Sequence, residues 1–164
     1  MISSVSAPPP HEHRVRVRYG ETDQMGVVYH AEYLAWMDEG RTQLLEELGF
    51  PYAEVERQGY GLAVRRCDLR YRFPARFGDV VRVLTRVLRV RGASVAFAYE
   101  ILRVEEGRDG PLLATGSVEL ACTSLSGERG PRELPEPIRR ALEEQVAADQ
   151  SAPVRPTGAR AAPD

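Results

Sequence analysis

The chain has 164 residues, of which 43% are hydrophobic, and a net charge of −2 at pH 7. This composition is typical of one globular domain and excludes a disordered or collagen-like chain. No stretch approaches the ~18 apolar residues of a membrane span, so we expect no membrane partner, and we expect no signal peptide. The net charge argues against a nucleic-acid partner. Two cysteines, Cys67 and Cys122, are too few for a disulfide framework, so reduced thiols and a cytoplasmic location are expected.

Every basic side chain is arginine, and the arginines are concentrated in the middle of the chain. Residues 1–60 carry 5 Arg and 10 acids, whereas residues 65–91 carry 9 Arg and 2 acids. A basic segment therefore lies within a mildly acidic protein.

The first half of the chain predicts a leader, a strand and a helix. Residues 1–13, with three consecutive prolines, are predicted to be a disordered leader. Strict alternation over residues 14–19 predicts a half-buried strand. Apolar residues at helical spacing predict a helix over roughly residues 31–48, which Gly49 and Pro51 end.

The second half predicts an antiparallel meander, because β-rich segments are joined by short turns. The alternating segments are residues 67–73, 81–88, 95–102 and 112–123. Residues 135–147 predict a short amphipathic helix and residues 148–164 a disordered tail. The order of these strands and helices predicts a single α+β domain over residues 14–147, in which a five-stranded antiparallel β-sheet wraps one long central α-helix.

Residues 19–33, between the first strand and the helix, read Tyr-Gly-Glu-Thr-Asp-Gln-Met-Gly-Val-Val-Tyr-His-Ala-Glu-Tyr. Unpaired backbone N–H groups at a helix start can hold a carbonyl oxygen as it becomes an oxyanion. A carboxylate shortly before the helix could attack the carbonyl or activate water. Aspartate before a helix is also the usual cap, so spacing alone leaves both roles open for Asp23.

This motif, followed by Asp38-Glu39-Gly40-Arg41, resembles the hotdog-fold acyl-CoA thioesterases, in the branch containing 4-hydroxybenzoyl-CoA thioesterase and the YbgC-type enzymes. Residues 70–79 resemble the second strand and turn of the same family, and the resemblance covers about residues 13–125. It implies the hotdog fold and hydrolysis of an acyl-CoA thioester to a free acid and CoA, without a metal or redox cofactor. It also implies a homodimer, or a homotetramer built as a dimer of dimers, with acyl pockets between subunits.

By the same resemblance, Asp23 is the catalytic nucleophile or general base, and His30 is a catalytic residue whose backbone N–H polarises the thioester carbonyl. The substrate-binding residues are then Gly26, Val27, Tyr29 and Tyr33. Arginine pairs with phosphate through its planar fork, so Arg89 and Arg91, on the turn before Gly92, are expected to bind the phosphates of CoA.

Three alternatives stay open. A hotdog-fold dehydratase or hydratase could use His30 with Glu39 as acid–base partners, although we expect Glu39 to pair with an arginine. A thioesterase acting on acyl-carrier protein, or a non-catalytic acyl-CoA-binding protein, would share the fold. No metal site is predicted, since His11 and His13 have no third ligand near them in sequence. Unpaired edge strands favour a homo-oligomer with two-fold symmetry.

Overall fold

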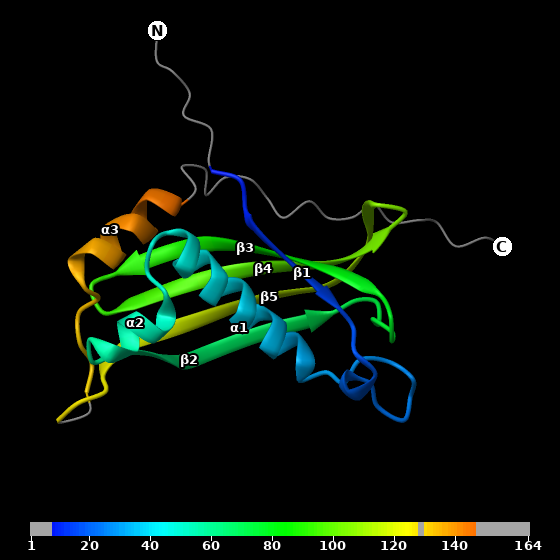
Figure 1. Ribbon diagram of the computed structural model, residues 1–164, viewed down its shortest axis with the longest axis horizontal. Coiled ribbons are helices and arrows are strands. Elements are labelled where there is room, and N and C mark those ends of the chain that lie inside the picture. The colour runs from blue at the N-terminus through cyan, green and yellow to red at the C-terminus, as the bar shows by residue number, and fades with distance from the viewer. Residues whose placement is uncertain (1–7, 128–129, 147–164) are drawn as a thin grey trace, which may run out of the picture.

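The computed structural model describes residues 8–127 and 130–146, which form a five-stranded sheet with helices on one side (Figure 1). The strands are β1 (His11–Arg16), β2 (Tyr60–Tyr71), β3 (Val80–Arg91), β4 (Ser94–Glu105) and β5 (Arg108–Ser124). The helices are the short 3-10 helix η1 (Tyr19–Glu21), α1 (Glu32–Glu47), α2 (Tyr52–Arg57) and α3 (Glu136–Gln145). No helix among the described residues is long and apolar enough to cross a membrane.

The sheet is antiparallel throughout, in the order β1-β3-β4-β5-β2. β3, β4 and β5 form the predicted meander. The first predicted segment of that meander, now β2, does not pair with β3 as a meander requires, but with β5 at the far edge of the sheet, while β1 pairs with β3. The predicted five-stranded antiparallel sheet is therefore confirmed.

Helix α1 packs across one face of the sheet with Trp36, Met37 and Leu45 fully buried. The helix comes very close to β3 at Gly40, where an added Cβ atom would lie 2.6 Å from Thr85 Oγ1. It has 16 residues, slightly fewer than predicted, and it contacts mainly β1 and β3. The middle of β2, residues 63–68, stays exposed.

Strand β2 is consequently an exposed edge. Cys67 is paired with Val118, which is paired with the buried Phe97, so Cys67 is on the helix side of the sheet. Cys67 is nevertheless exposed, as are Val64 and Tyr71 on the same strand. A 12-residue edge with apolar side chains open to solvent is a template for pairing with another chain.

Both ends of the first strand correct the sequence prediction, since β1 covers His11–Arg16 and not residues 14–19. β1 begins at His11, three residues before the predicted strand, because His11 and His13 face α1 and bond to the carboxylates of Glu47 and Glu39 at 2.8 and 2.9 Å. Residues 11–13 therefore belong to the sheet and not to a leader. Residues 1–7 and the predicted tail, 148–164, lie outside the described residues.

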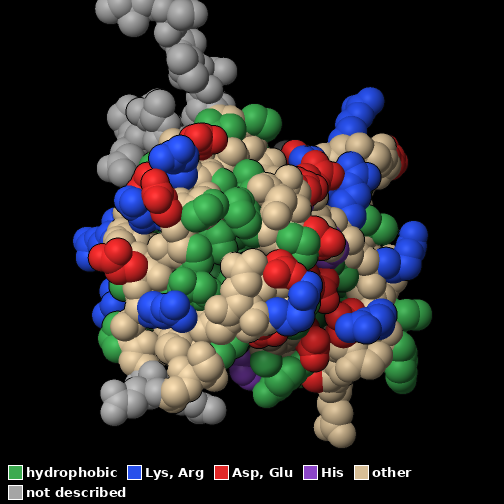
Figure 2. Space-filling model, turned by 60° about the vertical axis from the view of Figure 1, so that its left-hand side comes forward, with side chains coloured by type: hydrophobic (Ala, Val, Ile, Leu, Met, Phe, Trp, Pro, Cys, Tyr) green, Lys and Arg blue, Asp and Glu red, His purple; other side chains and the backbone are tan. Residues whose placement is uncertain are grey.

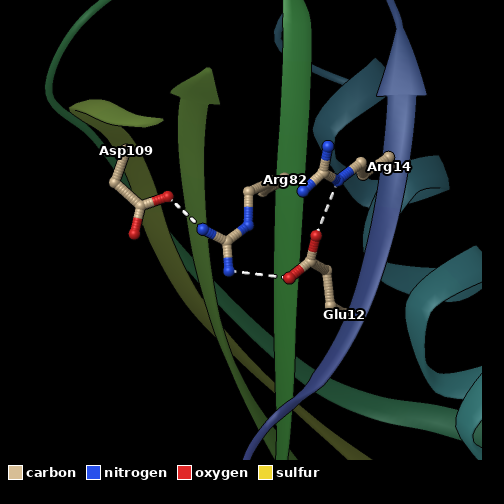
Figure 3. A network of polar contacts seen from close by, with 4 residues as sticks. All are labelled: Glu12, Arg14, Arg82 and Asp109. Atoms are coloured by element: carbon tan, nitrogen blue, oxygen red, sulfur yellow. Dashed lines mark hydrogen bonds and ion pairs between the residues drawn. The ribbon is translucent and has the colours of Figure 1, made fainter. Parts of the chain in front are cut away.

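A polar network on the other face ties the sheet together (Figure 3). Arg82 on β3 donates to Glu12 on β1 at 2.7 Å and also bonds Asp109 at the start of β5, while Arg14 donates to Glu12 at 2.7 Å. These bonds and the charge of Arg14 and Arg82 outweigh partial desolvation and lower the pKa of Glu12. Elsewhere, charges of both signs are interspersed over the face displayed in Figure 2.

Candidate active site

The motif identified in the sequence folds into a tight hairpin between η1 and α1. Thr22 pairs with Val28, and the backbone N–H of Asp23 donates to the Val27 carbonyl at 2.9 Å. The N–H of Gly26 donates back to the Asp23 carbonyl at 2.9 Å. Gly26 has a φ of 72°, which favours glycine because other residues are strained there. The loop is thus held by its own backbone.

The carboxylate of Asp23 is half-buried and fixed by one bond, in which its Oδ1 accepts the Met25 N–H at 2.8 Å. No described residue donates a hydrogen bond to Oδ2. Asp23 therefore stabilises its own turn, as a capping residue would, and still has one oxygen available for chemistry.

The start of α1 follows directly. Ala31 precedes the helix without a capping side chain, and the backbone N–H groups of His30 and Ala31 donate to no acceptor among the described residues. The His30 carbonyl accepts the Tyr71 hydroxyl at 2.8 Å, which ties the helix start to β2. The exposed His30 ring lies 4.3 Å from the Tyr29 ring, centroid to centroid. Donors suited to a carbonyl oxygen are thus held close to the Asp23 loop.

Glu21 is a buried residue of this region that the sequence reasoning missed. Its carboxylate accepts the Arg18 backbone N–H at 2.6 Å, the Arg18 guanidinium at 3.1 Å and the Trp36 indole N–H at 3.2 Å. Burial opposes its ionisation, but these bonds outweigh burial and hold its pKa below the ordinary value. The Glu21 carbonyl also accepts the Tyr29 N–H at 2.8 Å. Glu21 therefore joins both ends of the loop to α1.

Tyr33, predicted to line the acyl pocket, lies in the core of the domain with 2% of its surface exposed. Its hydroxyl accepts the Ala75 N–H at 3.1 Å, and the Ala75 carbonyl accepts the Val28 N–H at 2.8 Å. Burial raises the pKa of Tyr33, so it stays a neutral phenol. In this position Tyr33 supports the Asp23 loop from the core through Ala75, and it does not line a pocket within the chain. Gly26 and Tyr29, two other predicted substrate-binding residues, are exposed.

The fold of the chain does not bring Arg89 and Arg91 to Asp23. β3 starts at Val80 near the loop, and Arg89 lies nine residues farther along, a distance of about 30 Å at ~3.3 Å per residue. Arg89 lies 3.5 Å from Glu119, and Arg91 is exposed at the opposite end of the sheet.

Glu39 is bonded to His13, and the expected pairing with an arginine is wrong. Glu39 thus faces β1 and has a partner there, so no Glu39–His30 pair forms. Among residues 8–127 and 130–146, no three His, Cys, Asp or Glu side chains cluster as metal ligands would.

Comparison with known proteins identifies the family. Residues 17–142 match the family model of the Thioesterase-like superfamily. The chain belongs to this superfamily. The match covers the Asp23 loop, α1, strands β2 to β5 and most of α3, and it begins just after β1.

Several proteins of known name or structure are similar to the chain. Acyl-CoA thioester hydrolase YbgC of Escherichia coli O6:H1 is 33% identical over 124 residues, 76% of this chain and 89% of that protein. YneP of Bacillus subtilis is 41% identical over 87 residues, 53% of this chain but only 63% of YneP. A crystal structure of a Thermus thermophilus protein has a TM-score of 0.74 at 38% identity, covering 81% of this chain and 97% of that one.

Proposed function

We propose that the protein is an acyl-CoA thioesterase in which Asp23 performs the chemistry. The observation that carries this proposal is the Asp23 carboxylate, which its own turn fixes through Oδ1 while Oδ2 has no described partner. As a general base, Asp23 would take a proton from the water that attacks the thioester carbon. As a nucleophile, it would attack that carbon itself, expel the CoA thiolate, and form an anhydride that water then hydrolyses.

The start of α1 would supply the electrophilic assistance. The unpaired N–H groups of His30 and Ala31 are suited to the thioester oxygen as it gains negative charge. Because a backbone donor performs this role, the His30 side chain is expected to contact substrate and to contribute less to kcat than Asp23.

We further propose that the complete site lies between two copies of the chain joined along β2. Two-fold pairing of the β2 edges is antiparallel, so the Tyr60 end of one copy lies beside the Tyr71 end of the other. Tyr60 pairs with Ser124 at the end of the sheet where β3 turns into β4, the location of Arg89 and Arg91. Pairing would therefore move these two arginines of a second copy toward the Asp23 loop of the first, where CoA phosphates could reach them.

The direct test is thiol release from a panel of CoA esters, from acetyl to palmitoyl with benzoyl and phenylacetyl added. Asp23→Asn should lower turnover on the best substrate by ~10²–10⁴. The amide keeps an acceptor for the Met25 N–H, so the turn and the melting temperature should change little. Glu144→Gln, an exposed change on α3, is the matched control. Near-normal turnover of Asp23→Asn would contradict the assignment.

The same panel separates the alternatives. A carrier-protein thioesterase would release thiol faster from an acyl-carrier-protein thioester than from the matching CoA ester. A hydratase would add water to an enoyl-CoA without releasing thiol, and a binding protein would retain acyl-CoA without turnover. Light scattering at micromolar concentration that gives a monomer mass would contradict the shared site.

A further inference from the structure

The three most exposed large apolar side chains of the described residues lie at the end of the sheet that carries the Asp23 loop. Tyr19, Met25 and Phe77 are 78%, 82% and 63% exposed, and the rings of Tyr19 and Phe77 meet edge to face at 5.7 Å. Two arginines lie among them: Arg16 donates to the Gly78 carbonyl at 3.3 Å and Arg76 to the Gly26 carbonyl at 3.5 Å. We call Arg16, Tyr19, Met25, Arg76 and Phe77 the arginine–aromatic tip.

The backbone under the tip is firmly held. The Val17 N–H donates to the Asp79 carbonyl at 2.9 Å, the Gly78 N–H donates to the Val17 carbonyl at 3.1 Å, and Val28 bonds to Ala75 as described above. These bonds join the segment after β1, the Asp23 loop and the turn before β3. The exposed apolar groups are therefore presented on a fixed frame, and clustered exposed apolar groups of this kind mark interaction sites.

The charge of the tip favours an anionic partner. Arg16 and Arg76 form no ion pair with any residue of the described ranges, whereas nearby carboxylates are engaged. Glu21 is buried against Arg18, and Asp79 lies 3.6 Å from Arg103 and accepts the Arg76 N–H at 2.9 Å. Asp23 is half-buried in its own turn. Among the described residues, the two arginines of the tip therefore carry positive charge without a carboxylate partner.

A second copy of the chain is a poor occupant of the tip. A two-fold contact would place identical patches against each other, and the arginines would then repel. β2 and β1 are the two opposite edges of the sheet, and Arg16 and Tyr19 lie at or just after the end of β1, so pairing along β2 leaves the β1 side of the tip free. Projecting aromatic side chains flanked by arginines suit a fluid surface that deforms around them, where aromatic rings settle at headgroup level.

We propose that the arginine–aromatic tip docks the protein on an anionic lipid bilayer. Tyr19, Met25 and Phe77 would enter the headgroup region, while Arg16 and Arg76 pair with lipid phosphates. Each arginine near such a surface is worth about five-fold in partitioning, so binding is reversible and salt-sensitive. Building on the proposed function, docking would turn the Asp23 loop toward the bilayer, into which long-chain acyl thioesters partition.

The test is flotation of the full chain with phosphatidylcholine vesicles, with and without phosphatidylglycerol, at low and high salt. Wild type should float with the anionic vesicles at low salt, and an Arg16→Gln, Arg76→Gln variant should lose about 25-fold in partitioning. Tyr19→Ser with Phe77→Ser should also release the protein. Arg139→Gln with Arg140→Gln on α3 makes the same charge change elsewhere, and Leu125→Ser removes another exposed apolar side chain; both should bind as wild type.

Circular dichroism and melting verify that each variant is folded. Wild type that never floats, tip variants that float like wild type, or equal binding to neutral vesicles would each overturn the proposal. So would tip-dependent binding of an acidic carrier protein without vesicle binding. Because flotation needs no thioester, its failure leaves the proposed hydrolysis standing, and failure of hydrolysis leaves the flotation result unaffected.

Discussion

Replacing Glu21 with glutamine tests whether this buried carboxylate fixes the Asp23 loop to α1. The carboxylate accepts three hydrogen bonds, from the Arg18 backbone, the Arg18 guanidinium and the Trp36 indole. Glutamine has the same shape but only one oxygen, and its NH₂ group is a donor. Whichever way the amide turns, the NH₂ group faces at least one donor that previously had an acceptor.

The size of the effect follows from burial. Glu21 is 4% exposed and Trp36 1%, so water cannot replace the missing acceptor. One unpaired buried donor costs about 1–3 kcal/mol, and replacing charged bonds with neutral ones adds about 1 kcal/mol. We expect Glu21→Gln to lose about 2–4 kcal/mol of unfolding free energy at pH 7, with a fall of roughly 10 °C in melting temperature.

The loss should depend on pH. The pKa of Glu21 is lowered in the folded protein, so its carboxylate stabilises the fold above its ordinary pKa of 4.5. That stabilisation is lost as the pH falls through the lower folded value. The difference between wild type and Glu21→Gln should therefore be constant from about pH 8 to 6 and shrink in acid.

Urea unfolding at fixed protein concentration, followed by circular dichroism, measures the effect. Trp36→Phe removes one of the donors that the amide would leave unpaired. Glu21→Gln should therefore cost about 1–2 kcal/mol less in that background. Glu144→Gln on the surface is the control. A Glu21→Gln variant within about 0.5 kcal/mol of wild type, the range of ordinary surface changes, would refute the reasoning.

Three further changes test other parts of the structure. Tyr33→Phe leaves a buried backbone N–H without its acceptor, so it should cost about 1–3 kcal/mol in a thermal melt and lower kcat; an unchanged melt would contradict the support role. Gly40→Ala places a methyl group 2.6 Å from Thr85 Oγ1 and should cost about 1–3 kcal/mol, most of which Thr85→Ala should restore; absence of rescue would locate the strain elsewhere. Arg89→Ala with Arg91→Ala should raise KM for acyl-CoA while kcat stays within a few-fold, and KM for a pantetheine thioester, which lacks the nucleotide phosphates, should not change. Equal losses of activity on both substrates would show that these arginines do not bind the phosphates.

The sheet could be predicted from the sequence because most strands alternate strictly. Where the sequence prediction failed, the cause is physical. Register shifts lie between Val64 and Arg66 on β2, and between Val87 and Arg89 on β3. An extra residue at a bulge reverses the alternation, so the first half of β2 gave no period-two pattern and the predicted strand began only at residue 67. The start of β1 was missed because its histidines are polar and face carboxylates on α1.

At the candidate site, the sequence motif predicted which loop carries the site but not which residues support that loop. Asp23 and Gly26 lie in the recognisable segment, and the structure shows that hydrogen bonds fix the turn between them. Nothing in the sequence distinguishes Glu21 from an exposed carboxylate, since its partner Trp36 is 15 residues away and only folding buries the pair. The high arginine content of residues 65–91 also did not predict which arginines lie near Asp23. A strand of 12 residues, such as β3, places its first and last residues about 36 Å apart.

The order of strands also dictates the order in which the chain can fold during synthesis. β3, β4 and β5 are joined by short turns and can form hairpins as they emerge from the ribosome. β1 must wait for β3, about 70 residues later, and β2 can pair only with β5, the last strand made. Until Ser124 has emerged, α1 has no complete surface to cover, and its apolar face is exposed. A nascent chain stalled before β5 should therefore bind chaperones that recognise apolar segments, and release from them should follow once the last strand is free.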